Sequence, residues 1–130
     1  MSTTICLDLG IAHTGLAISR EGILAEPLAT IFETQKEKLL GKILPFIAKY
    51  SPDALIIGVP PYGPLVQRAQ SLKDELGKVF SGEIILFPED NSSRSARTVM
   101  KENHKTLDQR KQEEHQTAAA LILQEYLDSL

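Results

Sequence analysis

The stretch TICLDLGIAHTGLAISREGILAEPLATI, residues 4–31, decides the fold class of this chain. It contains three β-rich and mostly apolar runs, at 4–9, 14–20 and 22–31, joined by short links. Three consecutive extended runs with short links predict an antiparallel meander. Pro27 in the third run favours an edge strand or a bulge, because proline cannot donate a hydrogen bond to a neighbouring strand.

Helical and extended patterns alternate after this meander. Apolar residues recur at helical spacing over 34–50, with Thr34 as the candidate N-cap, and Pro45 predicts a kink or break in that helix. Continuous apolar runs at 53–59 and 83–88 predict strands buried on both faces, with a helix over 65–80 between them. Further helices are expected over 93–103 and, after a polar segment at 103–112, to about Leu127. This order predicts an α/β fold, a mixed sheet with helices on both faces.

The size and composition of the chain narrow the function classes. A length of 130 residues predicts one domain over 1–130. The single cysteine, Cys6, excludes an internal disulfide and a cysteine-based zinc site, and it favours a reducing, cytoplasmic setting. No run approaches the ~20 apolar residues of a membrane span, and no basic segment precedes an apolar one as in a secretory signal. We therefore expect no membrane partner.

Charge is distributed unevenly along the chain. The formal net charge of −3 excludes a general nucleic-acid coat protein. Residues 94–111, however, hold six basic and two acidic residues, so this stretch is positive and the rest of the chain is negative. Arg94, Arg97 and Lys101 would share one helix face, which suits a phosphate backbone. The alternative is a solvated helix face that binds nothing.

Three residues are candidates for catalysis. Asp8 lies in an apolar strand, where a charge is costly unless it is paired or binds a cation. Glu89 ends a buried strand, and sites in α/β sheets gather at the carboxyl ends of strands. His115 opens the apolar face of the last helix. The local alternatives are a solvent-facing strand end for Asp8, a helix-dipole partner for Glu89 and a hydrogen-bonded core histidine for His115. Together the three could hold Mg²⁺ or Mn²⁺.

Four segments, in this order, carry a resemblance to a known family. They are LDLG with GLAIS within 7–19, PDALIIGVP at 52–60, IILFPEDNSS at 84–93 and AAALILQEYL at 118–127. They resemble the YqgF/RuvX family, small bacterial proteins with an RNase H-like fold that are described as Holliday junction resolvases and pre-16S rRNA nucleases. The resemblance implies a five-stranded mixed sheet, with its first three strands antiparallel, flanked by helices.

The resemblance also implies residue roles. Asp8 matches the metal-binding aspartate of the family's first strand, and Glu89 matches the glutamate of its DER box. His115 stands where the family usually has an aspartate, and histidine occurs on the corresponding helix of related RuvC-type resolvases. Ala12 and His13 replace the family's basic pair, so His13 joins Arg94, Arg97 and Lys101 as a candidate nucleic-acid contact.

The expected function is therefore a metal-dependent endonuclease. Asp8, Glu89 and His115 would be its catalytic metal ligands, Mg²⁺ or Mn²⁺ its cofactor, and precursor 16S rRNA or branched DNA its partner, with a homodimer favoured for junction cleavage. The replaced site positions leave an alternative open, a catalytically weakened paralogue that binds nucleic acid or the ribosome. Actin-like and sugar-kinase ATPases share the fold, but this chain is too short for their two domains.

Overall fold

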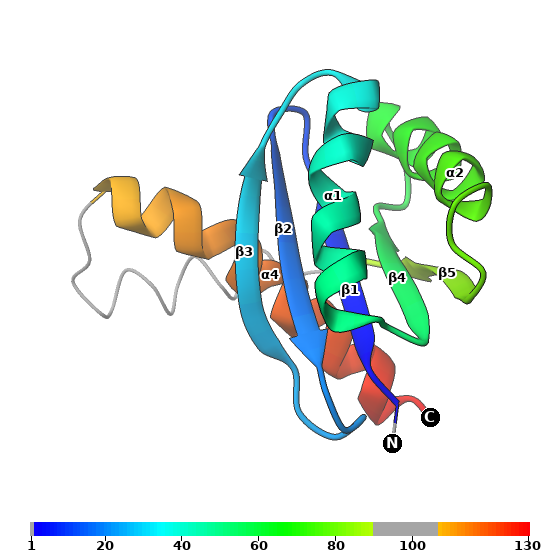
Figure 1. Cartoon of the computed structure of the whole chain (residues 1–130). Coiled ribbons are helices and arrows are strands. Elements are labelled where there is room, and N and C mark those ends of the chain that lie inside the picture. Colours follow the sequence, from blue (N-terminus) through cyan, green and yellow to red (C-terminus); the bar gives the residue numbers. More distant parts are fainter. Residues whose placement is uncertain (1, 90–106) are drawn as a thin grey trace.

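The sheet has five strands in the order β3-β2-β1-β4-β5 (Figure 1). The computed structural model describes residues 2–89 and 107–130, with side chains described up to 89 and from 113 onward. The strands are β1 (Thr4–Leu9), β2 (His13–Ser19), β3 (Glu26–Phe32), β4 (Ala54–Val59) and β5 (Glu83–Pro88). β1, β2 and β3 pair antiparallel, whereas β4 and β5 run parallel to β1. The predicted mixed sheet, antiparallel in its first three strands, is confirmed.

Helices cover both faces of this sheet, as predicted. α1 (Lys36–Tyr50) and α2 (Pro64–Gly77) lie on one face, and α4 (Leu107–Asp128) lies on the other (Figure 1). α4 packs mainly on β2 and β3 and also contacts β1. In the described ranges no helix combines the length and apolarity needed to cross a membrane. The helix predicted over 93–103 lies outside the described residues.

The central strand β1 sends alternate side chains into two separate cores. Ile5, Leu7 and Leu9 belong to the core under α1 and α2. Cys6 belongs to the core under α4, and Asp8 shares its face by the two-residue period of a strand. All six residues of β1 are buried, including the carboxylate-bearing Asp8. The candidate acid therefore points into the layer between the sheet and α4.

The predicted break of the first helix at Pro45 and its predicted N-cap are both wrong. α1 runs unbroken through Pro45. Both Pro45 and Gly41, whose carbonyl loses its helical partner, are exposed, so water can satisfy that carbonyl. Thr34 is not the N-cap. Gln35 occupies that position, and the Glu33 carboxylate accepts hydrogen bonds from the backbone N–H groups of Thr34 and Gln35 at 3.1 Å each.

Two predicted boundaries also move. β3 begins at Glu26 rather than at residue 22, because the preceding residues form a loop that α4 fixes. Gly22 has a φ of 80°, and Gln124 on α4 bonds the backbone of Ile23 and Ala25 at 3.0 and 2.9 Å. α4 begins at Leu107, within the segment that polarity alone predicted to precede the helix.

Candidate active site at the carboxyl end of β1

Asp8 lies between two glycines of the neighbouring strands. Its cross-strand partners are Gly15 on β2 and Gly58 on β4. Cross-strand partners project to the same face, so no side chain stands directly beside Asp8 on the α4 face of either neighbour. Asp8 is nevertheless only 7 % exposed. The Asp8 carboxylate is thus buried, although the two residues paired with Asp8 in the sheet are glycines without side chains.

Glu89 approaches this part of the sheet from the β4 side. It follows β5, and its backbone N–H donates to the carbonyl of Val59 at 2.7 Å. A Cβ atom placed on Gly58 would lie 3.8 Å from Oε2 of Glu89 and 3.1 Å from Cδ1 of Ile122. The Glu89 carboxylate therefore occupies the space above Gly58, the strand neighbour of Asp8.

The buried thiol of Cys6 responds to both carboxylates. Burial is the main reason that the pKa of Cys6 is raised well above its usual value, and the negative charges of Asp8 and Glu89 raise this pKa further. Two carboxylates that act on the same buried atom lie in one neighbourhood. The structure thus brings Asp8 and Glu89 into one neighbourhood, and the catalytic and metal-binding roles assigned to them stay predictions.

His115 lies on the other side of Asp8, against β2. α4 crosses β2 so closely that a Cβ atom on Gly15 would overlap the backbone carbonyl oxygen of His115. The imidazole of His115 stacks on that of His13, with ring centroids 4.8 Å apart and planes 4° apart. The His13 ring also meets the Phe32 ring edge-on, with centroids 4.9 Å apart. Asp8 is therefore flanked by Glu89 on the β4 side and by the histidine stack on the β2 side.

The donor chemistry of this site suits a hard divalent cation. Among the side chains described, no three from histidine, cysteine, aspartate or glutamate form a group ready to hold a metal ion. Mg²⁺ does not need such a cage, since it is often held by one or two carboxylates and completed by water and substrate phosphate. Asp8 and Glu89 fit that requirement, and His115 as a third ligand stays a prediction.

The predicted basic face could not be placed relative to this site. Arg94, Arg97 and Lys101 lie outside the described residues, so their role stays a prediction. His13, the fourth predicted nucleic-acid contact, is at the start of β2, beside His115.

Sequence reasoning missed what Gly15 and Gly58 do. Gly15 allows the backbone of α4 to approach β2 closely. Gly58 leaves room for the Ile122 side chain and the Glu89 carboxylate. A glycine inside a strand is a usable signal for such a close approach. The ring of Phe32 was also missed, and nothing local in the sequence sets it apart.

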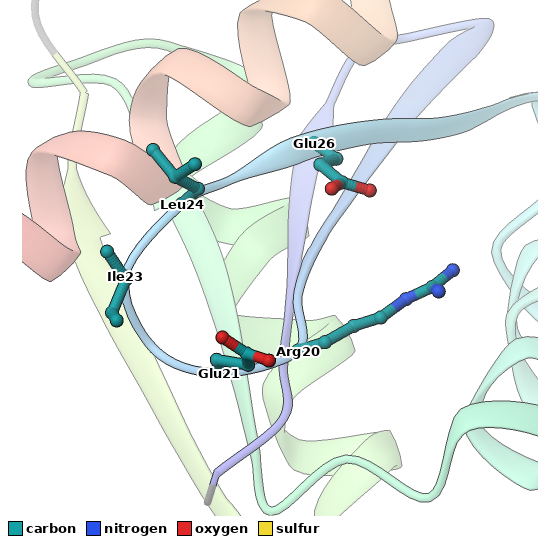
Figure 2. Close-up of a pocket in the computed structure, with 5 residues that line it drawn as sticks. All are labelled: Arg20, Glu21, Ile23, Leu24 and Glu26. Atoms are coloured by element: carbon teal, nitrogen blue, oxygen red, sulfur yellow. The ribbon is translucent and has the colours of Figure 1, made fainter.

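A cavity lies away from this site, beside the loop between β2 and β3. This cavity of about 440 Å³ is lined by Arg20, Glu21, Ile23 and Leu24 of the loop between β2 and β3, and by Glu26 at the start of β3. Figure 2 shows how these side chains lie along the loop. This loop follows Ser19, which pairs with Thr4 at the amino end of β1. None of the predicted site residues lines the cavity. The candidate active site is therefore at the opposite end of β1.

Solved structures share this fold. The Thermus thermophilus RuvC in complex with a Holliday junction substrate superposes with a TM-score of 0.65 at 15 % identity, over 98 % of this chain and 94 % of that one. The fowlpox virus Holliday junction resolvase gives a TM-score of 0.62 at 13 % identity, over 98 % and 99 % of the two chains. The fold is RNase H-like, as the resemblance implied.

Curated relatives match almost end to end. A protein of Thermoanaerobacter pseudethanolicus named "Putative pre-16S rRNA nuclease" is 34 % identical over 130 residues, or 95 % of this chain and 94 % of the relative. A protein of the same name from Bacillus cytotoxicus is 30 % identical over 131 residues, or 95 % and 96 %.

The family model described as "RuvX: Holliday junction resolvase" matches residues 2–129. That match covers both strands flanking Asp8 and the whole of α4. The chain belongs to the RuvX (YqgF) family.

Proposed function

We propose that this chain is a divalent-cation-dependent nuclease that hydrolyses phosphodiester bonds in structured nucleic acid, with precursor 16S rRNA as its first candidate substrate. One observation carries the proposal: the buried Asp8 carboxylate has the Glu89 carboxylate beside it, across Gly58. Membership of the RuvX family supports the reaction class, and the names of the relatives support the substrate.

In this proposal Asp8 and Glu89 hold Mg²⁺ or Mn²⁺. When bound, the cation would supply Lewis-acid stabilisation of the charge that develops on the phosphoryl oxygens. His115, on the β2 side of Asp8, either completes the ligand set or holds a proton near the reacting phosphate, since imidazole exchanges protons near neutral pH. Replacing the family's aspartate by His115 also leaves the site one negative charge weaker.

The nucleic-acid backbone would contact His13 and the basic residues Arg94, Arg97 and Lys101. Each phosphate contact contributes about 0.9 to the slope of log affinity against log salt on duplex DNA. Removing one of these three basic side chains should therefore reduce that slope by about one unit, while cleavage at saturating substrate persists.

A Holliday junction is the second candidate substrate. The description of the matched family favours it. Symmetrical cleavage of two strands needs two sites, so this candidate includes a homodimer, whereas rRNA processing does not. Both candidates place the protein in the cytoplasm.

The test is cleavage of precursor 16S rRNA and of a four-way DNA junction, each with Mg²⁺, with Mn²⁺ and with a chelator. Asp8→Asn removes the negative charge at nearly constant side-chain shape. It should lower the cleavage rate by at least about 100-fold, because replacing even a residue that only contacts a metal ligand typically lowers metal affinity or activity 10–100-fold. Asp74→Asn, on the exposed side of α2, is the matched control and should cleave normally.

The alternative function has a distinct signature. A binding module would retain salt-dependent binding in Asp8→Asn and cleave neither substrate with any ion. Wild-type cleavage that persists unchanged in Asp8→Asn would overturn the proposed site.

A further inference from the structure

Three aromatic rings from three elements form a row beside the candidate site. Phe32 ends β3, His13 begins β2 and His115 belongs to α4. The Phe32 and His13 rings meet edge-on at 4.9 Å, and the His13 and His115 rings stack at 4.8 Å with nearly parallel planes. Elements far apart in the sequence thus supply one continuous aromatic surface.

The register of the sheet places this row next to Asp8. His13 pairs with Phe32, and Gly15, two residues further along β2, pairs with Asp8. Residues two apart in a strand share a face, so His13 and Phe32 project to the same face as Asp8. A diagonal neighbour of this kind is about 7–8 Å away between backbones. This spacing applies to His13, and Phe32 lies one strand further out, two strand spacings of about 4.8 Å from β1.

Phe32 is the accessible end of the row. Its side chain is 47 % exposed, so a ligand can reach the ring. Its backbone carbonyl accepts a hydrogen bond from Nζ of Lys42 at 3.1 Å, which ties the end of the edge strand to α1. The ring is therefore presented from an anchored backbone rather than from a free chain end.

We propose that Phe32, backed by the stacked pair His13 and His115, is a platform on which an unpaired nucleobase next to the scissile phosphate stacks. This inference rests on the proposed nuclease function and names the substrate feature that its site selects. Proteins bind unpaired nucleotides by stacking bases on aromatic side chains, whereas bases inside a continuous duplex are already stacked on each other. The site thus takes a phosphodiester at an unpaired nucleotide, in RNA or in branched DNA.

The experiment measures stacking without cleavage. In the Asp8→Asn background, single-stranded RNA and DNA oligonucleotides that carry one 2-aminopurine are titrated with protein, and fluorescence quenching reports stacking of that base. Phe32→Leu keeps an apolar side chain but removes the ring, and it should weaken binding about tenfold and abolish the quenching. Phe32→Tyr keeps the ring and should restore both.

Two controls separate the ring from general effects. Ile23→Ala removes another exposed apolar side chain, 68 % exposed, in the loop between β2 and β3, and it should change neither readout. A fully paired duplex of the same sequence should bind Phe32→Leu as tightly as the parent. Circular dichroism of each variant confirms the fold.

The outcomes are decisive in both directions. Quenching that depends on the Phe32 ring, with either the RNA or the DNA oligonucleotide, supports the platform. The oligonucleotide that is quenched shows whether the platform binds RNA or DNA bases. Equal binding and equal quenching in Phe32→Leu would overturn it. Because no arm requires cleavage, the platform can stand even where the cleavage assay fails, and the cleavage assay can succeed where the platform fails.

Discussion

The two faces of the central sheet are built from side chains of different size. Large aliphatic residues dominate the face under α1 and α2: Ile5, Leu7, Leu9, Leu16, Ile18, Leu55 and Ile57. The face under α4 carries small or polar residues in its central strands: Cys6, Asp8, Gly15, Ala17 and Gly58, with Ile56 as the large exception. The residues of α4 that pack against this face include the small side chains of Ala119 and Ala120.

This difference separates stability from function. Large side chains fill the first face and remove much apolar surface from water, which is the main source of folding free energy. Small residues on the second face let α4 reach the sheet backbone and leave space for two carboxylates. One layer of the molecule is thus a packed core, and the other is a core with a polar site at one end.

The largest effect is expected where α4 meets the backbone of β2. Gly15→Val would drive side-chain atoms into the carbonyl of His115, and a helix backbone cannot give way as a flexible side chain can. We expect a loss of about 4 kcal/mol or more in the free energy of unfolding, at the upper end for point substitutions. Urea unfolding followed by far-UV circular dichroism measures it.

Gly41→Ala is the matched control. Gly41 lies within α1 with nothing within 4 Å of a Cβ atom, so this change should stabilise by about 0.5–1 kcal/mol. Equal effects of the two substitutions would contradict the close approach of α4.

The next prediction compares the stability lost on truncating two adjacent residues of β1 whose side chains point to opposite faces of the sheet. Leu7 and Cys6 are both fully buried. Leu7→Ala opens a cavity in the aliphatic core and should cost about 3 kcal/mol, whereas Cys6→Ala removes one atom and should cost about 1 kcal/mol. The same urea titration compares them, and a Cys6→Ala loss as large as that of Leu7→Ala would show that both faces depend equally on packing.

A third change should stabilise the aliphatic face. Thr14 is fully buried, and within the described residues its Oγ1 has no hydrogen-bond partner. Thr14→Val replaces the hydroxyl by a methyl group of similar size, which removes the cost of an unsatisfied polar atom and should raise stability by about 1 kcal/mol. A raised midpoint in thermal unfolding supports this expectation, and a lowered one would mean that the hydroxyl is satisfied in solution.

The smallest effect on stability is expected at the ion pair between Lys42 of α1 and Glu33, which follows β3. Lys42 pairs with Glu33 at 3.0 Å, and the hydrogen bond from Lys42 lowers the pKa of the Glu33 carboxyl. A lowered pKa in the folded state gives stability that is present above the unfolded pKa of about 4.3 and is lost as the pH falls through the folded value. Lys42→Met should therefore be slightly less stable at pH 7, and the gap should close in acid. A gap that persists at pH 2 would show that the hydrogen bond from Lys42 to the Phe32 carbonyl, and not the pairing with Glu33, causes it.

The elements of the fold could be predicted because their patterns are local. The apolar runs of β1, β4 and β5 and the helical spacing of α1 and α2 appear in a few consecutive residues. The boundary of β3 failed because it depends on a distant contact: Gln124 fixes the loop before this strand. The start of α1 failed because the Glu33 carboxylate bonds the backbone of Thr34 and Gln35, and Gln35 is the N-cap.

The site was predictable in part for the same reason. A charge in an apolar strand marks Asp8, and a strand end marks Glu89. The stack of His13 on His115 depends on how α4 lies across β2, which no local pattern records. The resemblance to a family was the reason for assigning Asp8, Glu89 and His115, which are far apart in the sequence, to one site.

The order of the chain has a consequence for how the protein matures on the ribosome. β1, the strand that bears Asp8, is made before α4, which covers that face. Chains emerge at about 5–20 residues per second, and a domain generally folds as a unit. Until α4 has been made, the Asp8 face of β1 therefore lacks its cover, and the histidine stack cannot form. We expect the site to assemble only when α4 packs on β1 and β2.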